Sequence, residues 1–439
     1  MKIREPMLLM VACAFACAGP DDDFPIDSST SASSESESST HDTDEAQTTS
    51  GQEGHTSESS SETTGSPCET SEDCPDVGSP FCETGECRSC TDMPEPDAAC
   101  AELDPNMPAC VDGGCEQCDA DSTWACPESL PNCDVETHTC TGCADHDDCP
   151  DSACNLDAGT CFASSLVAHV DGDDAADFHT INDALDFYPN DVVIILHELS
   201  SGFYEESVSI TGGRRVAIVA APDEQPRWRA GQTDEPTVRV GGASWAFLRG
   251  LRLESNWYDI GLEVSAAEVW LQRSRVVDNA LGNVFVGGVG SLRVENSFIG
   301  GVKADSYGLH VVNGSVDVVY STLATSSTPA LSCVQGSSVR ARNSIIVSGI
   351  PTSEIHCPWA DLDDNAIEMH WGPNVALGDM SPAWFESFTS GDYHLQNGAY
   401  PIAIATAAVW RSGDPSTDID GDPRPSGDGS PDFAGADIP

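Results

Sequence analysis

Few residues of this 439-residue chain are spaced for chemistry, and the most regular set is a column of small side chains. Five segments of similar sequence carry a glycine or serine at the same place, once every 23 or 24 residues. The column consists of Gly250, Ser274, Ser297, Ser321 and Ser344. One of these serines could be a nucleophile, but the chain has no G-x-S-x-G elbow to support it. Because the position recurs in every segment, we expect a structural ladder of turns.

A second file runs through the same segments and consists of Trp270, Arg293, Asp317 and Arg340. If the segments are stacked strands, these side chains point outward and neighbour one another. Opposite charges stacked in this way would form an exposed salt-bridge ladder, which stabilises a sheet modestly. A flat face with aromatic and arginine groups would also suit a polysaccharide. The sequence leaves both interpretations open, and the file is a candidate ligand-binding face.

Three aspartates near the C-terminus, Asp418, Asp420 and Asp422, alternate around Gly421 and are weak candidates for calcium ligands. An EF-hand loop needs glycine at its sixth position and glutamate at its twelfth, where this chain has Gly429. A turn without an ion is therefore the favoured interpretation. No other cofactor is indicated.

The histidines give little support for catalysis. His310 stands alone in GLHVV, and His197-Glu198 lacks the second histidine of a zinc-protease motif. Polysaccharide lyases and esterases need carboxylates or calcium and a base that converge in one groove. The paired aspartates and the Gly-His-Gly motif of galacturonases are missing from the sequence. We assign no catalytic residue, and a polysaccharide lyase or hydrolase is the alternative to a non-catalytic protein.

Sixteen of the twenty cysteines form four sets of four, and two residues separate each set from the next. The sets are Cys68, Cys74, Cys82, Cys87; Cys90, Cys100, Cys110, Cys115; Cys118, Cys126, Cys133, Cys140; and Cys143, Cys149, Cys154, Cys161. Units of about 20 to 26 residues are too small for a hydrophobic core, so we expect disulfides to stabilise them. Each unit allows three pairings. The CxxC motifs at the unit boundaries could instead be zinc or redox sites, but export favours structural disulfides. The layout resembles the Cys-rich repeats of secreted myxobacterial proteins.

The first seventeen residues predict an export signal. A short basic start precedes an apolar run from Met7 to Ala16, which is too short to span a bilayer. The order Ala14-Phe15-Ala16-Cys17 resembles the bacterial lipobox, in which the cysteine takes a diacylglyceryl group, although that motif usually has leucine in place of Ala14. We expect lipidation of Cys17. Cys13 is the competing acceptor, and signal cleavage without lipid or a plain signal anchor are the alternatives.

Residues 18–67 are nearly all Ser, Thr, Glu, Asp and Gly, which predicts a disordered stalk that holds the following parts away from a membrane. The formal net charge of −55 disfavours binding to nucleic acid or to an anionic membrane surface. Only the lipid anchor is expected to contact a membrane. These features predict a location at the outer membrane or cell surface.

The composition changes after the Cys-rich region, residues 68–161, and predicts a folded body over residues 165–439. Residues 177–190 predict a short amphipathic helix, with Thr180 and Asp183 spaced as a capping box. An apolar strand, VVIILHE, and the pattern G-x-Y-x-E-x-V-x-I from Gly202 to Ile210 follow. This order resembles the start of pectinesterase-like and other right-handed β-helix proteins, in which the helix plugs the open end of the solenoid.

The repeat consists of WAFLRGLRL from Trp245, VWLQRSRVV from Val269, LRVENSFIG from Leu292, VDVVYSTLA from Val316 and VRARNSIIV from Val339. A stack of such coils buries a core that one coil cannot bury alone. Alternation predicts that the first and third residues of each segment point inward. The predicted pairs are Trp245/Phe247, Val269/Leu271, Leu292/Val294, Val316/Val318 and Val339/Ala341. The sequence therefore predicts an all-β, right-handed parallel β-helix of the pectin lyase-like kind, preceded by a capping helix, a disulfide-rich region and a stalk.

Cys333 and Cys357 lie 24 residues apart, which is one period of the repeat. Stacked strands lie about 4.8 Å apart, within the Cα separation that a disulfide needs. We therefore expect a Cys333–Cys357 bond.

Two C-terminal stretches, SPAWFESFTSGDYHLQNGAYPI from Ser381 and DIDGDPRPSGDGSPDFAGAD from Asp418, resemble the end of choice-of-anchor Q β-helix proteins. In this chain Ala399-Tyr400-Pro401 replaces the usual Ser-Pro-Ala. The resemblance implies a surface protein and no particular activity. We therefore expect a non-catalytic exported lipoprotein whose partner is a polysaccharide or another cell-surface component.

Overall fold

The computed structural model describes residues 68–439 except 75–77, 120–125, 128, 144–147, 150–151, 156–158, 173–175, 232–233, 304–306, 351–353 and 370. Cys17, the export signal and the predicted stalk therefore lie outside the described residues. Within the described residues, every helix is too short or too polar to cross a lipid bilayer.

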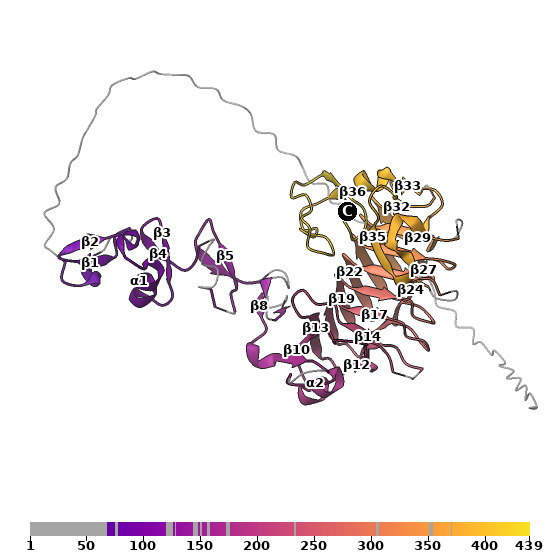
Figure 1. Ribbon diagram of the computed structural model, residues 1–439, viewed down its shortest axis with the longest axis horizontal. Helices are drawn as coiled ribbons and strands as arrows, with labels where there is room; N and C mark the ends of the chain where they lie inside the picture. Colours follow the sequence, from indigo (N-terminus) through magenta and orange to yellow (C-terminus); the bar gives the residue numbers. More distant parts are fainter. Residues whose placement is uncertain are drawn as a thin grey trace, which may run out of the picture. The chain divides into compact units, whose positions relative to one another are not determined.

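The body is an all-β parallel β-helix, as the repeat predicts (Figure 1). From β10 to β30, each turn of the chain contributes one strand to each of three parallel sheets, so neighbours within a sheet are one turn apart in sequence. The first and last turns are incomplete. The first sheet contains β9 (Val167–Val170), β10 (Val192–Leu196), β13 (Arg215–Ala220), β16 (Trp245–Arg249), β19 (Glu268–Gln272), β22 (Ser291–Glu295), β25 (Ser315–Val319), β28 (Ser338–Arg342) and β31 (Asp361–Asp363).

In each complete turn, the strands of the other two sheets follow the strand of the first sheet. The second sheet contains β11 (Tyr204–Glu205), β14 (Arg227–Arg229), β17 (Arg252–Glu254), β20 (Arg275–Val277), β23 (Phe298–Gly301), β26 (Thr322–Thr325), β29 (Ile345–Ser348), β32 (Ala366–Ile367) and β33 (Val375–Ala376). The third sheet contains β12 (Val208–Ile210), β15 (Val238–Gly241), β18 (Leu262–Ser265), β21 (Val284–Gly287), β24 (Leu309–Val312), β27 (Leu331–Cys333) and β30 (Ile355–His356).

The core is one continuous hydrophobic cluster formed by the inward side chains of all three sheets. In the first sheet, a single column of paired residues runs through Ile194, Ile218, Leu248, Leu271 and Val294, and all five are fully buried. Burial of one such side chain contributes about 1.5–3 kcal/mol. Stacking therefore supplies the stability that a single coil lacks.

One predicted inward pair is wrong. Ala246 pairs with Val269 and, together with Leu248, faces the core, whereas Trp245 and Phe247 face outward. Phe247 is nevertheless 0% exposed, because a second hydrophobic cluster covers the outer face of the lower turns. An aromatic residue buried on the outside produced the same hydrophobic pattern as an inward one, which shifted the prediction by one residue.

The predicted helix is α2, Ile181–Phe187, which follows β9 and lies at the start of the solenoid (Figure 1). Ile181, Ala184 and Leu185 are buried in the main core. The Thr180 hydroxyl accepts the backbone N–H of Asp183 at 3.1 Å, as the capping pattern predicts. The first turn thus carries a helix where later turns carry strands of the second and third sheets.

The motif from Gly202 to Ile210 holds this helix in place. The Glu206 carboxylate accepts the backbone N–H of Ile181 at 2.9 Å and of Asn182 at 3.0 Å, so it caps the helix N-terminus. The Tyr204 hydroxyl donates to the carbonyl oxygen of His197 at 2.7 Å. Burial raises the pKa of the Glu206 carboxyl.

Each Cys-rich unit is closed by two disulfides, which join its first cysteine to its third and its second to its fourth. The bonds are Cys68–Cys82, Cys74–Cys87, Cys90–Cys110, Cys100–Cys115, Cys118–Cys133, Cys126–Cys140, Cys143–Cys154 and Cys149–Cys161. The two cysteines of each CxxC motif therefore belong to different bonds. All sixteen cysteines of the region are bonded in these pairs.

The Cys-rich units otherwise contain small antiparallel hairpins and short helices. The elements are β1 (Phe81–Glu83) with β2 (Glu86–Arg88), β3 (Ala109–Val111) with β4 (Gly114–Glu116), β5 (Asn132–Asp134) with β6 (Thr139–Thr141), β7 (Cys154–Asn155) with β8 (Thr160–Cys161), α1 (Pro96–Leu103), and the 3-10 helices η1 (Ser71–Asp73) and η2 (Cys90–Asp92). A further 3-10 helix, η5 (Ser164–Leu166), leads into β9.

In the body, the expected bond between Cys333 and Cys357 is present, with a Cα–Cα distance of 4.8 Å.

The C-terminal segment, residues 380–439, folds back along the outer face of the second sheet. It contains the hairpins β34 (Phe385–Ser387) with β35 (Asp392–Leu395) and β36 (Ala408–Trp410) with β37 (Ser430–Asp432), and the 3-10 helices η6 (Pro382–Trp384), η7 (Phe388–Ser390) and η8 (Ile402–Thr406). Trp384, Phe388 and Tyr393 pack in one cluster with Phe298 and Ile345 of the second sheet. The segment therefore adds an outer hydrophobic layer to the upper turns.

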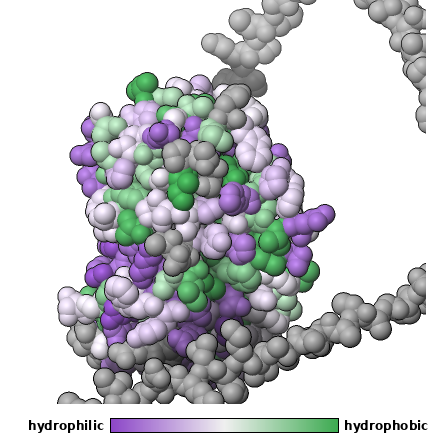
Figure 2. All heavy atoms as spheres, turned by 90° about the vertical axis from the view of Figure 1, so that its right-hand side faces the viewer, coloured by the Kyte–Doolittle hydropathy of each residue, from purple (hydrophilic) through white to green (hydrophobic). Residues whose placement is uncertain are grey.

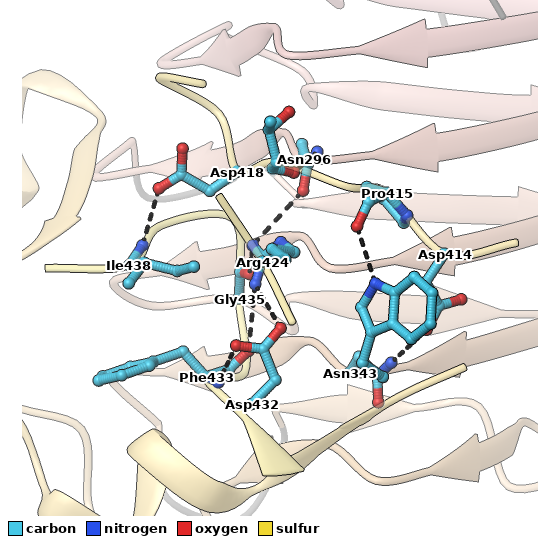
Figure 3. A network of polar contacts seen from close by, with 12 residues as sticks. Asn296, Asn343, Asp414, Pro415, Asp418, Arg424, Asp432, Phe433, Gly435 and Ile438 are labelled. Atoms are coloured by element: carbon cyan, nitrogen blue, oxygen red, sulfur yellow. Dashed lines mark hydrogen bonds and ion pairs between the residues drawn. The ribbon is translucent and has the colours of Figure 1, made fainter. Parts of the chain in front are cut away.

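A buried arginine anchors the same segment (Figure 3). The Arg424 side chain is 0% exposed, and its Nη1 lies 3.1 Å from Oδ2 of Asp432. Its Nη2 donates to the carbonyl oxygen of Gly435 at 2.9 Å and to Oδ1 of Asn296 at 3.5 Å. The guanidinium also lies 4.0 Å from the ring centroid of Tyr320. Asn296 and Tyr320 follow strands of the first sheet, so Arg424 joins the C-terminal segment to the solenoid.

Candidate ligand-binding site

The predicted outward file exists in the register of the first sheet. Trp270 pairs with Arg293, Arg293 with Asp317, and Asp317 with Arg340 on successive turns. Side chains two residues before them form a parallel outward file of Glu268, Ser291, Ser315 and Ser338. The outer face of β19, β22, β25 and β28 is thus a grid of two columns.

The contacts within the file differ from the expected salt-bridge ladder. Arg293 Nη2 lies 2.7 Å from Oε2 of Glu295 on its own strand, and the Arg293 guanidinium lies 4.7 Å from the ring centroid of Trp270. Arg340 approaches Asp361 at 3.9 Å. Among the described residues, Oδ1 of Asp317 has no hydrogen-bond partner although it is buried. Arg293 therefore pairs with the nearly buried Glu295 carboxylate of its own strand.

These side chains line a shallow hollow of about 400 Å³. Its lining includes both columns of the grid and Trp245. Indole rings offer flat apolar surfaces, arginines donate hydrogen bonds, and the serine hydroxyls accept them. That combination suits a ligand that has apolar C–H faces and many hydroxyl groups.

The serine column is structural, as expected, and its hydroxyls are fully engaged. The Oγ atoms of Ser274, Ser297, Ser321 and Ser344 each accept the backbone N–H one turn below at 3.1–3.2 Å and donate to the carbonyl two residues back. Gly250 does not belong to this column. Gly250 aligns with Arg273 of the next turn, because the residues that precede them, Arg249 and Gln272, pair with each other. Gly250 has a φ of 71° and Arg273 a φ of 45°, so both are in the left-handed region. Leu251 occupies the position below Ser274.

The histidines singled out in the sequence lie away from this hollow. His310, on β24, has Nδ1 3.1 Å from the Ser332 hydroxyl, and burial lowers its pKa. His197 has Nε2 3.1 Å from Nδ1 of His169 and Nδ1 3.4 Å from Oε1 of Glu224. Neither arrangement brings an acid, a base and a nucleophile together.

The calcium candidates do not converge. Oδ1 of Asp418 accepts the backbone N–H of Asp420, Gly421 and Asp422 at 2.8–2.9 Å, and its Oδ2 accepts that of Ile438 at 2.9 Å. These four bonds make Asp418 a turn-closing residue. The Asp420 carboxylate points elsewhere, with Oδ2 2.8 Å from Nε2 of His394.

A second hollow, of about 540 Å³, was not predicted from the sequence. It lies at the bend between the first and second sheets and is lined by Arg249, Arg252, Arg273 and Arg275. Closely spaced arginines in two consecutive repeats, LRGLR and QRSR, could have indicated this hollow. None of the four is a free cation: Arg252 pairs with Glu254 at 3.1 Å, Arg275 with Asp392 at 3.5 Å, Arg273 donates to the Thr417 hydroxyl, and Arg249 is also engaged.

Other hydrophobic side chains of the described residues are exposed outside the two hollows. They include Trp257, which is 65% exposed, Tyr258 and Leu281. On the face shown in Figure 2, hydrophobic groups are separated by polar ones. The grid on the first sheet therefore remains the best candidate for ligand binding.

Comparisons with known proteins describe the two parts of the chain separately. Residues 55–167 match a family of unknown function, DUF8331. Among solved structures, pectin methylesterase from Aspergillus niger is 18% identical, with 49% of this chain and 70% of that chain covered and a TM-score of 0.29. Pectate lyase Pel9A is 12% identical, with 62% and 95% covered and a TM-score of 0.29. These scores carry no argument about activity. The comparison with curated proteins finds no match.

Proposed function

We propose that this protein is a non-catalytic exported lipoprotein that displays its β-helix on an acidic stalk and binds a polysaccharide with the outer face of the first sheet. The observation that carries the proposal is the grid of Trp270, Arg293 and Asp317 beside a column of serines. The resemblance of the C-terminal segment to choice-of-anchor Q proteins and the Cys17 motif support display at a surface.

The regular spacing of the grid favours an extended ligand. Equivalent positions recur on each turn, about 4.8 Å apart. A linear sugar polymer repeats its hydroxyls and C–H faces along its length, so several of its units can contact successive turns. The hollow is open and its carboxylates, Glu268 and Asp317, lie two turns apart. A lyase or hydrolase is the alternative outcome of the test below.

We expect Trp270→Ala to weaken polysaccharide binding by about tenfold, because a central aromatic anchor typically contributes more than about 1 kcal/mol. The measurement is affinity electrophoresis of wild type and variant against a panel of neutral and acidic polysaccharides. Trp257→Ala is the matched control, since Trp257 also contacts a cation, Lys303 at 4.2 Å, but is not part of the first sheet. Equal binding by wild type and Trp270→Ala would contradict the proposed site. Release of sugar products, with or without calcium, that is lost in Arg293→Ala would establish the enzyme alternative.

We expect Cys17→Ser to abolish lipid attachment, because the serine hydroxyl cannot replace the thiol that accepts the diacylglyceryl group. Labelling of expressing cells with a radioactive fatty acid, followed by membrane fractionation, measures both attachment and location. Cys13→Ser is the control and should remain labelled and membrane-bound. Labelling that persists in Cys17→Ser but disappears in Cys13→Ser would reassign the anchor.

A further inference from the structure

Four titratable side chains from three stretches of the C-terminal segment meet beside the second sheet. Asp392 and His394 belong to β35, Asp420 lies in the loop closed by Asp418, and Asp437 lies two residues before the end of the sequence. One potential ligand atom from each of His394, Asp420 and Asp437 lies within 4.8 Å of the other two. None of these three residues takes part in the proposed polysaccharide site.

The imidazole ring of His394 lies between two carboxylates, Asp392 on the Nδ1 side and Asp420 on the Nε2 side. Its Nδ1 is hydrogen-bonded to Oδ1 of Asp392, and that carboxylate is also 3.5 Å from Nη1 of Arg275. Its Nε2 is shielded from solvent and lies 2.8 Å from Oδ2 of Asp420. Histidines that ligate metals commonly donate their second ring N–H to a carboxylate in this way.

The surroundings of the three atoms have an excess of negative charge. Asp437 is only 5% exposed, and its Oδ2 accepts the backbone N–H of Leu395 at 2.6 Å, which leaves the second oxygen available. Asp392, Asp420 and Asp437 contribute three carboxylates, whereas Arg275 is paired with Asp392 and His394 carries a positive charge only when it is protonated. Buried carboxylates are favourable only when cations or hydrogen bonds compensate them, so the cluster would gain from a dication.

We propose that His394, Asp420 and Asp437 bind a divalent transition-metal ion, with Asp392 as a positioning residue for His394. One imidazole nitrogen and two carboxylate oxygens form a donor set suited to zinc, with a fourth position for water. The site differs from the calcium candidates in the sequence, since Asp418 is occupied by backbone N–H groups and Asp420 alone is shared. The ion joins β35, the loop after Asp418 and the C-terminus, so its role is to fasten the C-terminal segment.

The test is isothermal titration of the full-length, chelator-treated protein with zinc chloride, together with the melting temperature at each zinc concentration. Wild type should bind one ion at this site and melt at a higher temperature with zinc. Asp392→Asn retains all three ligands and should bind zinc about 10–100-fold more weakly. His394→Gln and Asp437→Asn remove a ligand and should bind more weakly still.

His197→Gln is the matched control, because His197 also has a carboxylate and a second histidine nearby but lies outside the cluster. It should bind zinc as wild type does. Circular dichroism of each variant establishes that it is folded, and Asp437→Asn replaces His394→Gln if the latter is not. The proposal is overturned if wild type shows no saturable binding, if the folded ligand variants bind like wild type, or if His197→Gln loses the binding.

Discussion

Replacement of Arg424 by leucine is expected to lower the free energy of unfolding by about 3–5 kcal/mol, because it leaves the Asp432 carboxylate buried without its partner. The Asp432 side chain is 3% exposed and Arg424 is 0% exposed, so water cannot compensate the lost ion pair. The carbonyl oxygen of Gly435 and the amide oxygen of Asn296 lose a donor as well (Figure 3). Urea unfolding followed by tryptophan fluorescence measures the difference.

Two further variants separate the buried charge from the volume of the side chain. Arg340→Leu removes an arginine whose side chain is 52% exposed and should change the stability by less than about 0.5 kcal/mol. Arg424→Leu combined with Asp432→Leu removes both charges and should recover part of the loss. An Arg424→Leu variant as stable as wild type would contradict the anchoring role.

Complete reduction of the disulfides is expected to unfold the Cys-rich region while the β-helix stays folded. Loss of a native disulfide from a small domain costs about 2–5 kcal/mol, and each unit of about 20 residues has two and no alternative core. The body has one bond, Cys333–Cys357, and its stability comes from a continuous hydrophobic core. Hydrogen exchange resolved by peptide should show protection lost over residues 68–161 and retained in the strands of the three sheets.

The Cys333→Ser/Cys357→Ser variant is the control for the single bond of the body. Its exchange pattern without reductant should change only near β27 and β30. Protection that persists over residues 68–161 after complete reduction would mean that packing, and not the disulfides, holds these units together.

The repeat was predictable because its periodicity depends on neighbouring turns alone. Val269, Leu271, Leu292 and Val294 alternate cleanly, and the structure places all four in the core. The same period predicted the disulfide between Cys333 and Cys357, which the structure confirms. The prediction for the segment from Trp245 was wrong, because Phe247 is buried in a hydrophobic cluster on the outer face of the first sheet. A hydrophobic residue in this segment therefore does not always point into the solenoid.

The contacts of the C-terminal segment could not be predicted from the sequence. Asn296 donates to the carbonyl oxygen of Thr417 at 2.8 Å across 121 positions, and Arg424 reaches Asn296 across 128. No periodicity relates such residues, because the segment lies along the solenoid and does not continue it. The grouping of His394 with Asp420 and Asp437 depends on the same docking, so only the local turn around Gly421, which Asp418 closes, was predictable from the sequence.

The docking of the C-terminal segment changes how the solenoid responds to unfolding. Solenoids usually behave as one-dimensional arrays in which each repeat interacts only with the next, so that terminal repeats fray independently. Here Asn343 near the last turns bonds to Val409, while Arg273 and Asn296 several turns below bond to Thr417. The segment is a strap across consecutive turns and couples them mechanically. Loss of the top turn alone would break contacts with the strap, so the strapped turns from β19 upward should melt as one cooperative unit, at the cost of slower folding from the high contact order.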